Sequence, residues 1–293
     1  MADTLKAFET PLRDPLDVAG AYAFCQDLAN SHYENFPVAS RALPKRLRKH
    51  IAALYAFARI ADDFADEPEY EGQRKERLLD WRAQLHSLES PRHAVFVALK
   101  HTLTELALPV QPFDDLLSAF IQDTEKSRYE TFDEVLDYSR RSANPVGRIV
   151  LMIHGYRDPE MFKLSDSICT ALQLANFWQD VSVDLKKDRI YLPAEDFRQF
   201  GYTEADLRMG LVNEKFTALM KFQVNRTSAL FEQGRPLANR LAFPLSWEIR
   251  LTWLGGREIL RKIRKQGFDT VSRRPHLSKV DWIPLLVRSV LKS

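Results

Sequence analysis

Glycine is scarce in this chain, with only 10 among 293 residues. Leu, Ala, Arg, Lys and Glu are plentiful instead, and these residues favour helices over sheets. Because 45% of the residues are hydrophobic, the chain can bury a sizeable core. The sequence therefore predicts an all-α protein, which we interpret as one helical domain over residues 1–293, with a lead-in at 1–20 and an amphipathic C-terminal segment at 276–293.

A strong charge of either sign is also absent, since 42 basic and 40 acidic residues leave a formal charge of +2. So small a charge does not attract nucleic acid to the molecule as a whole, and we expect no nucleic-acid partner. The two cysteines, Cys25 and Cys169, lie in apolar, helix-like contexts. They indicate neither a disulfide framework nor a zinc site.

The sequence shows neither a leader-type apolar stretch at residues 1–20 nor the roughly 20 uncharged residues of a membrane-spanning helix. We expect a cytoplasmic protein, at most peripheral at the inner face of the membrane. Residues 282–292 have an amphipathic pattern. Core packing is the favoured interpretation of that pattern, and membrane docking is the alternative that would suit a lipid substrate.

Against this background, four carboxylates stand out in the alanine-rich stretch 55–67. On a helix, Tyr55, Arg59, Asp62 and Asp66 fall within an arc of roughly 60°. Apolar residues cover much of the remaining circumference, so the polar stripe is expected to be flanked by packed protein.

The pattern occurs again in stretch 173–184, where Gln173, Asn176, Asp180 and Asp184 share an arc of roughly 80° on a predicted helix. Two such acidic pairs, if both were buried bare, would repel each other, so we expect them to face each other across a cation. Oxygen-only ligands suit Mg²⁺, which bridges carboxylates to substrate phosphates. The alternatives are that each pair is a solvated helix face, or that the site is a di-iron centre, for which the Glu-x-x-His pattern is missing from both stretches.

Three further segments carry polar groups that could serve such a site. Residues 31–38 form a helix-breaking junction, and residues 138–148 place small residues and Pro145 inside a helix-like pattern, consistent with a ligand-lined kink or with ordinary packing. Residues 186–193 form a cationic exit whose basic groups can hold phosphate oxygens. Facing aspartates with Mg²⁺ would make diphosphate a better leaving group, and an apolar pocket would shelter the cation left behind.

The combined motifs resemble those of the squalene/phytoene synthase family. The resemblance rests on Tyr55-Ala-Phe-Ala-Arg59 before the first acidic pair and Arg189-Ile-Tyr191-Leu-Pro193 after the second, and it covers roughly residues 30–275. It implies an isoprenoid-synthase fold around a central prenyl-diphosphate cavity. It also implies that Mg²⁺ is held by Asp62, Asp63, Asp66, Asn176, Asp180 and Asp184, and that substrate is contacted by His32, Tyr33, Phe36, Tyr138, Gln173, Arg189, Tyr191 and Arg273.

Within the family, the stretches 32–38, 142–147 and 176–180 resemble the bacterial hopanoid-pathway branch of hydroxysqualene synthases. This implies that presqualene diphosphate loses diphosphate and that water captures the rearranged cation, without NADPH. Tyr55 and Arg59 are the implied catalytic residues, and Asn35 and Asn144 are candidates for holding the water, with backbone capping as the alternative. Gln179 and Gly256 stand where many members have an arginine and a tyrosine that face diphosphate, which agrees with an enzyme that handles one diphosphate instead of two.

Other interpretations stay open at this point. The protein could be a presqualene diphosphate, squalene, phytoene or dehydrosqualene synthase that condenses two prenyl diphosphates. It could also be a catalytically silent, family-like protein that binds lipid or assists assembly, although such a protein has no need of four mutually repelling aspartates. In either of the enzymatic cases, functional coupling to other squalene-pathway enzymes is expected.

Overall fold

The computed structural model describes residues 17–31 and 44–290. These residues form α-helices and short 3₁₀ helices, and their one β-type contact is an isolated parallel bridge between Arg128 and Ile190. The predicted all-α class is confirmed. The chain divides into two compact units: the described parts of residues 1–125 with 148–157, and the described parts of 126–147 with 158–293. Helix α9 (Asn144–Ile153) belongs to both, and the prediction of one domain stays a prediction.

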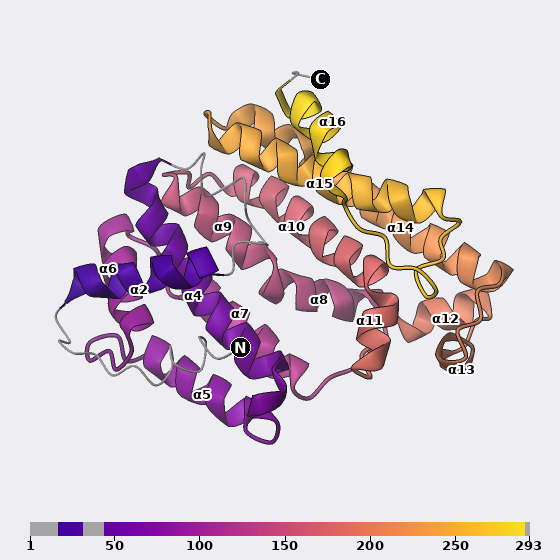
Figure 1. Cartoon of the computed structure of the whole chain (residues 1–293), viewed down its shortest axis with the longest axis horizontal. Coiled ribbons are helices and arrows are strands. Elements are labelled where there is room, and N and C mark those ends of the chain that lie inside the picture. The colour runs from indigo at the N-terminus through magenta and orange to yellow at the C-terminus, as the bar shows by residue number, and fades with distance from the viewer. Residues whose placement is uncertain (1–16, 32–43, 291–293) are drawn as a thin grey trace. The chain divides into compact units, whose positions relative to one another are not determined.

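The first unit is built around α4, which packs against its neighbours with an apolar face that includes Phe57 and Phe64 (Figure 1). Trp81 lies between these two rings and donates a hydrogen bond from Nε1 to the carbonyl of Phe57. Helix α4 ends before Pro68, because a residue preceding proline avoids the helical conformation and Glu67 is extended. The helices of this unit are α2 (Val18–Ser31), α4 (Lys45–Asp66), η2 (Pro68–Tyr70), α5 (Arg74–Leu85), α6 (Ala94–Leu106) and α7 (Gln111–Asp123).

The second unit is built around α10, which packs along α14 and also contacts α15 (Figure 1). Asp158 caps the start of α10 by accepting a hydrogen bond from the amide of Glu160, and Pro159 occupies the first turn, where a missing N–H costs nothing. The helices of this unit are α8 (Phe132–Ser142), α10 (Pro159–Gln179), α11 (Val181–Lys186), α12 (Ala194–Phe200), α13 (Glu204–Arg208), α14 (Glu214–Gly234), η3 (Arg235–Arg240), α15 (Leu245–Lys265) and α16 (Lys279–Val290).

Helix α14 continues directly into η3, and the long helix α15 follows. The predicted opening at Pro145 is a complete break, because α8 ends at Ser142 and α9 starts at Asn144. Proline fits the first turn of a new helix but not the interior of an old one. Among the described residues, none of the helices combines the length and the apolar character needed to cross a membrane.

Candidate active site

The first acidic motif lies on the last turns of α4, as predicted. Asp62 is 48% exposed, whereas Asp63 is 2% exposed, so consecutive carboxylates have opposite environments. Arg59, one turn earlier, contacts both, at 3.4 Å from Asp62 and 2.5 Å from Asp63. The helix therefore carries its own counter-charge, held in place by the i, i+3 and i, i+4 spacing.

Asp63 is buried beside Arg59, and this burial changes the pKa of its carboxyl group. Burial raises the pKa of Asp63 to about 7, although the Arg59 guanidinium acts in the opposite direction. Tyr55 lies a further turn back, and its buried hydroxyl has no hydrogen-bond partner among the residues that the structure describes. Burial also raises the pKa of this phenol. Asp63 thus acts on Arg59 in this structure, and its predicted role as a magnesium ligand stays a prediction.

The second acidic motif departs from the expected continuous helix. Helix α10 ends at Gln179, Asp180 has a non-helical ψ of 14°, and α11 starts at Val181. The backbone hydrogen bonds nevertheless continue in steps of four, from the amide of Asp180 to the carbonyl of Asn176 and from the amide of Asp184 to the carbonyl of Asp180. The i, i+4 spacing of the motif is therefore preserved across the junction. Gln173 is partly exposed and Asn176 is exposed.

Arg274 supplies the counter-charge of this second motif. Its Nε donates to Asp180 Oδ1 at 2.5 Å and its Nη2 donates to Asp180 Oδ2 at 3.2 Å. Gln179 fastens the same segment by donating from Nε2 to the carbonyl of Pro275 at 2.8 Å. The sequence prediction chose the neighbour Arg273, whose carbonyl accepts a hydrogen bond from Gln266. Arg274 was missed because it lies 94 residues from Asp180 and no local pattern connects the two.

Aromatic rings cluster beside the second motif. Phe177 and Tyr191 stack with their ring centroids 3.7 Å apart, and Tyr138 lies within 6.0 Å of both. Phe177 and Tyr191 also line a small pocket with Asp184 and Arg189. The structure thus brings together four groups that the sequence placed in the site: an acid, a cation and two tyrosines. The electron-rich ring faces can stabilise a nearby positive charge.

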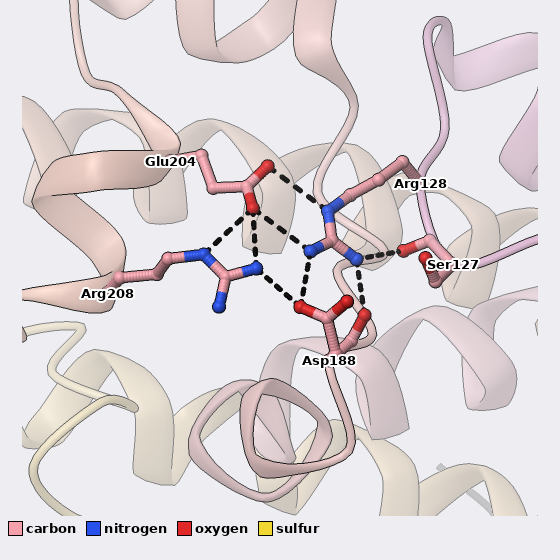
Figure 2. A network of polar contacts seen from close by, with 5 residues as sticks. All are labelled: Ser127, Arg128, Asp188, Glu204 and Arg208. Carbon is pink, nitrogen blue, oxygen red and sulfur yellow. Dashed lines mark hydrogen bonds and ion pairs between the residues drawn. The ribbon is translucent and has the colours of Figure 1, made fainter.

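A network of ion pairs holds the loop that carries Arg189 and Tyr191 (Figure 2). Arg128 bonds to Asp188 and to Glu204, and Arg208 bonds to the same two acids. Asp188 has a φ of 56°, a left-handed conformation that few residues adopt, and its carbonyl also accepts from Arg128. The amide of Ile190 bonds to the carbonyl of Ser127. Arg128 therefore fixes this loop through both acids and through the Asp188 carbonyl.

The candidate water-holding residue Asn144 is 6% exposed, and its Oδ1 accepts a hydrogen bond from Thr170 Oγ1 at 2.9 Å. This bond ties the start of α9 to α10 and differs from the backbone cap considered as the alternative. The other predicted residues, His32, Tyr33, Asn35 and Phe36, lie outside the described residues.

The donor set of the two motifs fits Mg²⁺ in its chemistry. Within residues 17–31 and 44–290, no group of three or more His, Cys, Asp or Glu could hold a metal ion by itself. Mg²⁺ is commonly bound by one or two carboxylates, with waters and substrate phosphates completing its octahedron. Each motif has at least one carboxylate with accessible oxygens: the side chain of Asp62 is 48% exposed in the first unit, and that of Asp180 is 25% exposed in the second.

The fold belongs to the class of all-α isoprenoid synthases. The structure of squalene synthase HpnC from Alicyclobacillus acidocaldarius matches with a TM-score of 0.83 and 39% identity, covering 87% of this chain and 97% of that chain. The squalene/phytoene synthase family matches residues 29–281, and the chain belongs to this family, as its motifs predict. Members of the family bind prenyl diphosphates and generally depend on a divalent metal.

Two relatives indicate the range of activities within the family. The phytoene synthase of Arthrospira platensis is 30% identical over 292 residues, covering 94% of each chain. The hydroxysqualene synthase of Rhodopseudomonas palustris is 34% identical over 252 residues, covering 85% of each chain.

Proposed function

We propose that the protein converts presqualene diphosphate and water into hydroxysqualene and diphosphate. The similarity to a hydroxysqualene synthase supports this reaction. The C–O bond to diphosphate breaks and its electron pair leaves with the diphosphate. The cyclopropylcarbinyl cation rearranges, a water oxygen adds to it, and a proton is released. The carbon skeleton is not reduced, so no NADPH is required.

The packing of Gln179 and Gly256 is the observation that carries this choice over condensation. Gln179 is buried, and its side-chain amide donates a hydrogen bond to the Pro275 carbonyl. A side chain at Gly256 would collide with the ring of Phe231 and would come within 2.8 Å of Leu172. Neither position can therefore offer the diphosphate contact that many family members have there. An enzyme that starts from presqualene diphosphate handles one diphosphate, whereas condensation requires two.

The two acidic motifs have the leading role in this proposal. Mg²⁺, when bound, would neutralise the diphosphate and improve it as a leaving group. We propose that its ligands come from both motifs and are Asp62, Asp63, Asp66, Asn176, Asp180 and Asp184. Arg59, Arg189 and Arg274 would stabilise the charge that develops on the departing oxygens. In the structure Arg59 already pairs with Asp62, and Arg274 already pairs with Asp180. These ion pairs hold the carboxylates and guanidiniums in position before substrate binds.

The remaining residues are assigned to the hydrocarbon part of the substrate and to its cation. Tyr138 and Tyr191, with Phe177, present ring faces that suit an allylic or cyclopropylcarbinyl cation. Asn144, with Asn35, would hold the water, because an uncharged amide can orient water without itself capturing the cation. Tyr55, Gln173 and Arg273 are assigned as further substrate-side groups, together with His32, Tyr33 and Phe36.

The test is incubation of the purified protein and Mg²⁺ with presqualene diphosphate in ¹⁸O-labelled water, without NADPH. Mass spectrometry of the extracted C30 products should show hydroxysqualene that contains the heavy oxygen. The Asp184→Asn variant controls for spontaneous hydrolysis and should give no product above background. Condensation of farnesyl diphosphate at a rate comparable with turnover of presqualene diphosphate would overturn the proposal and favour a synthase of the first half-reaction.

A further inference from the structure

Helix α16 turns an apolar ridge toward solvent. The ridge consists of Val280, Ile283, Val287 and Val290, which are 74%, 65%, 56% and 71% exposed. On a helix these four positions share an arc of about 80°. The opposite side is buried, with Leu285 at 1% exposure. Core packing, the favoured interpretation of this amphipathic segment, therefore accounts for only one face of the helix, and the other apolar face needs a different partner.

The ridge is fixed in place by its contacts with α15 (Figure 1). Near one end, Trp247 donates from Nε1 to Ser289 Oγ at 2.8 Å, and at the other end Lys262 pairs with Asp281 at 2.8 Å. The two helices are thus antiparallel and joined at both ends. Phe243, which is 80% exposed, precedes α15 by two residues, at the end where Trp247 meets Ser289. The ridge is preformed and needs no folding step to bind.

Cations flank the ridge on both sides. By helical spacing, Lys279 projects about 20° outside one edge of the ridge at the start of the helix, and Arg288 projects about 80° outside the other edge near its end. Arg288 also lines an open pocket with Arg235, Arg250 and Trp253. The one acid of the helix, Asp281, is already paired with Lys262. An apolar ridge between basic groups is the pattern of a helix that lies in a membrane interface.

The basic residues of the chain are also concentrated in the region that contains the ridge. Residues 235–293 contain 13 Lys and Arg against 4 Asp and Glu, although the complete chain carries only +2. The region that contains the ridge is therefore strongly basic, and the rest of the chain is acidic. Each Lys or Arg near the surface of an anionic bilayer raises the affinity of such a region for the bilayer about fivefold. A partner protein would need an acidic, apolar groove to match it.

We propose that the ridge on α16 and the arginine pocket beside it form a docking surface for an anionic phospholipid bilayer. Val280, Ile283, Val287 and Val290 enter the interface between headgroups and acyl chains, while Arg235, Arg250 and Arg288 bind phosphate headgroups. The helix lies in the plane of the membrane and does not span it. This binding goes beyond the proposed reaction and does not depend on it.

The experiment is flotation of the purified full chain with vesicles of equal parts phosphatidylglycerol and phosphatidylcholine, and with phosphatidylcholine alone. The wild type should bind the anionic vesicles, and salt should weaken the binding. The double variant Ile283→Glu/Val287→Glu should bind about tenfold more weakly or worse, because it places acids on the ridge. Arg288→Glu should weaken binding by about 25-fold, because reversing one charge changes the net charge by two units at about fivefold each.

Matched controls come from the same unit. Met209→Glu alters a side chain that is 65% exposed, the same exposure as Ile283, but away from the ridge. Arg140→Glu alters an arginine on α8 that is 64% exposed. Both control variants should bind vesicles like the wild type. Turnover of detergent-solubilised presqualene diphosphate is measured separately, so a failure of the proposed reaction would be visible independently of vesicle binding.

Three outcomes would overturn the proposal. The wild type could fail to bind anionic vesicles, or the ridge variant could bind them as well as the wild type. In the third, sedimentation shows a dimer that Ile283→Glu/Val287→Glu dissociates, while vesicles bind neither protein. That result would assign the ridge to an interface between copies of this chain.

Discussion

Arg59 and Arg274 neutralise the two acidic motifs by different routes. Arg59 belongs to the same helix as its acids and reaches Asp63 at 2.5 Å across one turn. Arg274 comes from a segment 94 residues away and donates hydrogen bonds from two nitrogens to the carboxylate of Asp180. The first acid is 2% exposed and the second is 25% exposed. A similar spacing of carboxylates is thus combined with a buried local ion pair in one motif and an accessible long-range pair in the other.

The spacing of the acids along the chain therefore does not by itself assign their roles. Asp63 cannot lose Arg59 without leaving a charge buried, so this pair contributes to the stability of α4. Asp180 can exchange Arg274 for another cation at little cost, because exposed ion pairs contribute little to stability. The second motif is therefore better suited to bind and release a charged ligand.

Amide substitutions should show that both motifs serve one reaction. We expect Asp66→Asn and Asp184→Asn each to lower kcat/KM for presqualene diphosphate about 10³-fold, because each removes charge that stabilises the departing diphosphate. Steady-state kinetics at saturating Mg²⁺ provides the measurement. Asp80→Asn and Asp137→Asn, at exposed positions in the first and second unit, are the controls and should be near wild type. Full activity of either motif variant would mean that the motifs are not equivalent.

Removing each arginine should show how much its ion pair contributes to the stability of the fold. We expect Arg59→Gln to lower the free energy of unfolding by about 2 kcal/mol, since Asp63 is left buried and unpaired. Adding Asp63→Asn to that variant should restore most of the loss. Arg274→Gln should cost less than about 1 kcal/mol, because this guanidinium is 49% exposed. Urea denaturation measures all three values. Equal costs for the two single variants would remove the contrast between the motifs.

A second buried acid, for which residues 17–31 and 44–290 provide no ion-pair partner, extends the contrast with Asp63. Glu248 on α15 is 9% exposed, and burial alone raises its pKa to about 7. Below about pH 4.5 both folded and unfolded states are protonated, and between that pH and 7 only the unfolded state ionises. Stability therefore falls as pH rises through this window. At pH 8, Glu248→Gln should be about 2 kcal/mol more stable than wild type.

The pH dependence also supplies the control for that substitution. Near pH 4 the wild-type Glu248 is protonated, so Glu248→Gln should be nearly neutral there. Glu258, on the same helix and also 9% exposed, is paired with Arg261, so Glu258→Gln should give no gain at pH 8. Denaturation of the three proteins at both pH values decides the point. A gain from Glu248→Gln that is the same at both pH values would rule out ionisation as its cause.

The smallest effect is expected from the network in Figure 2, which positions the loop after the second motif. Arg128→Gln should raise KM for presqualene diphosphate about fivefold through displacement of Arg189, with kcat changed less. Arg128→Lys should restore little, because a lysine cannot bond in the same fork to Asp188 and Glu204. Arg198→Gln, which breaks an exposed pair with Glu130, is the control. A fall in kcat alone, with KM unchanged, would contradict the positioning role.

Much of the fold could be read from the sequence, because helices are set by local spacing. The stop of α4 at Pro68 and the two long helices after residue 213 follow from proline chemistry and from apolar periodicity. The break at Asp180 was not predicted, since its only sign is a backbone angle within a sequence that suits a helix. The left-handed conformation of Asp188 was missed for a similar reason.

The candidate site divides along the same line. The family, the two acidic motifs and Arg59 could all be identified from the sequence, because residues within a few turns of one helix meet whatever the rest of the chain does. The pairing of Arg274 with Asp180, the hold of Arg128 on the loop of Arg189 and the exposed apolar ridge of α16 could not be predicted in this way. These contacts join segments far apart in the chain, and their partners depend on how whole helices pack.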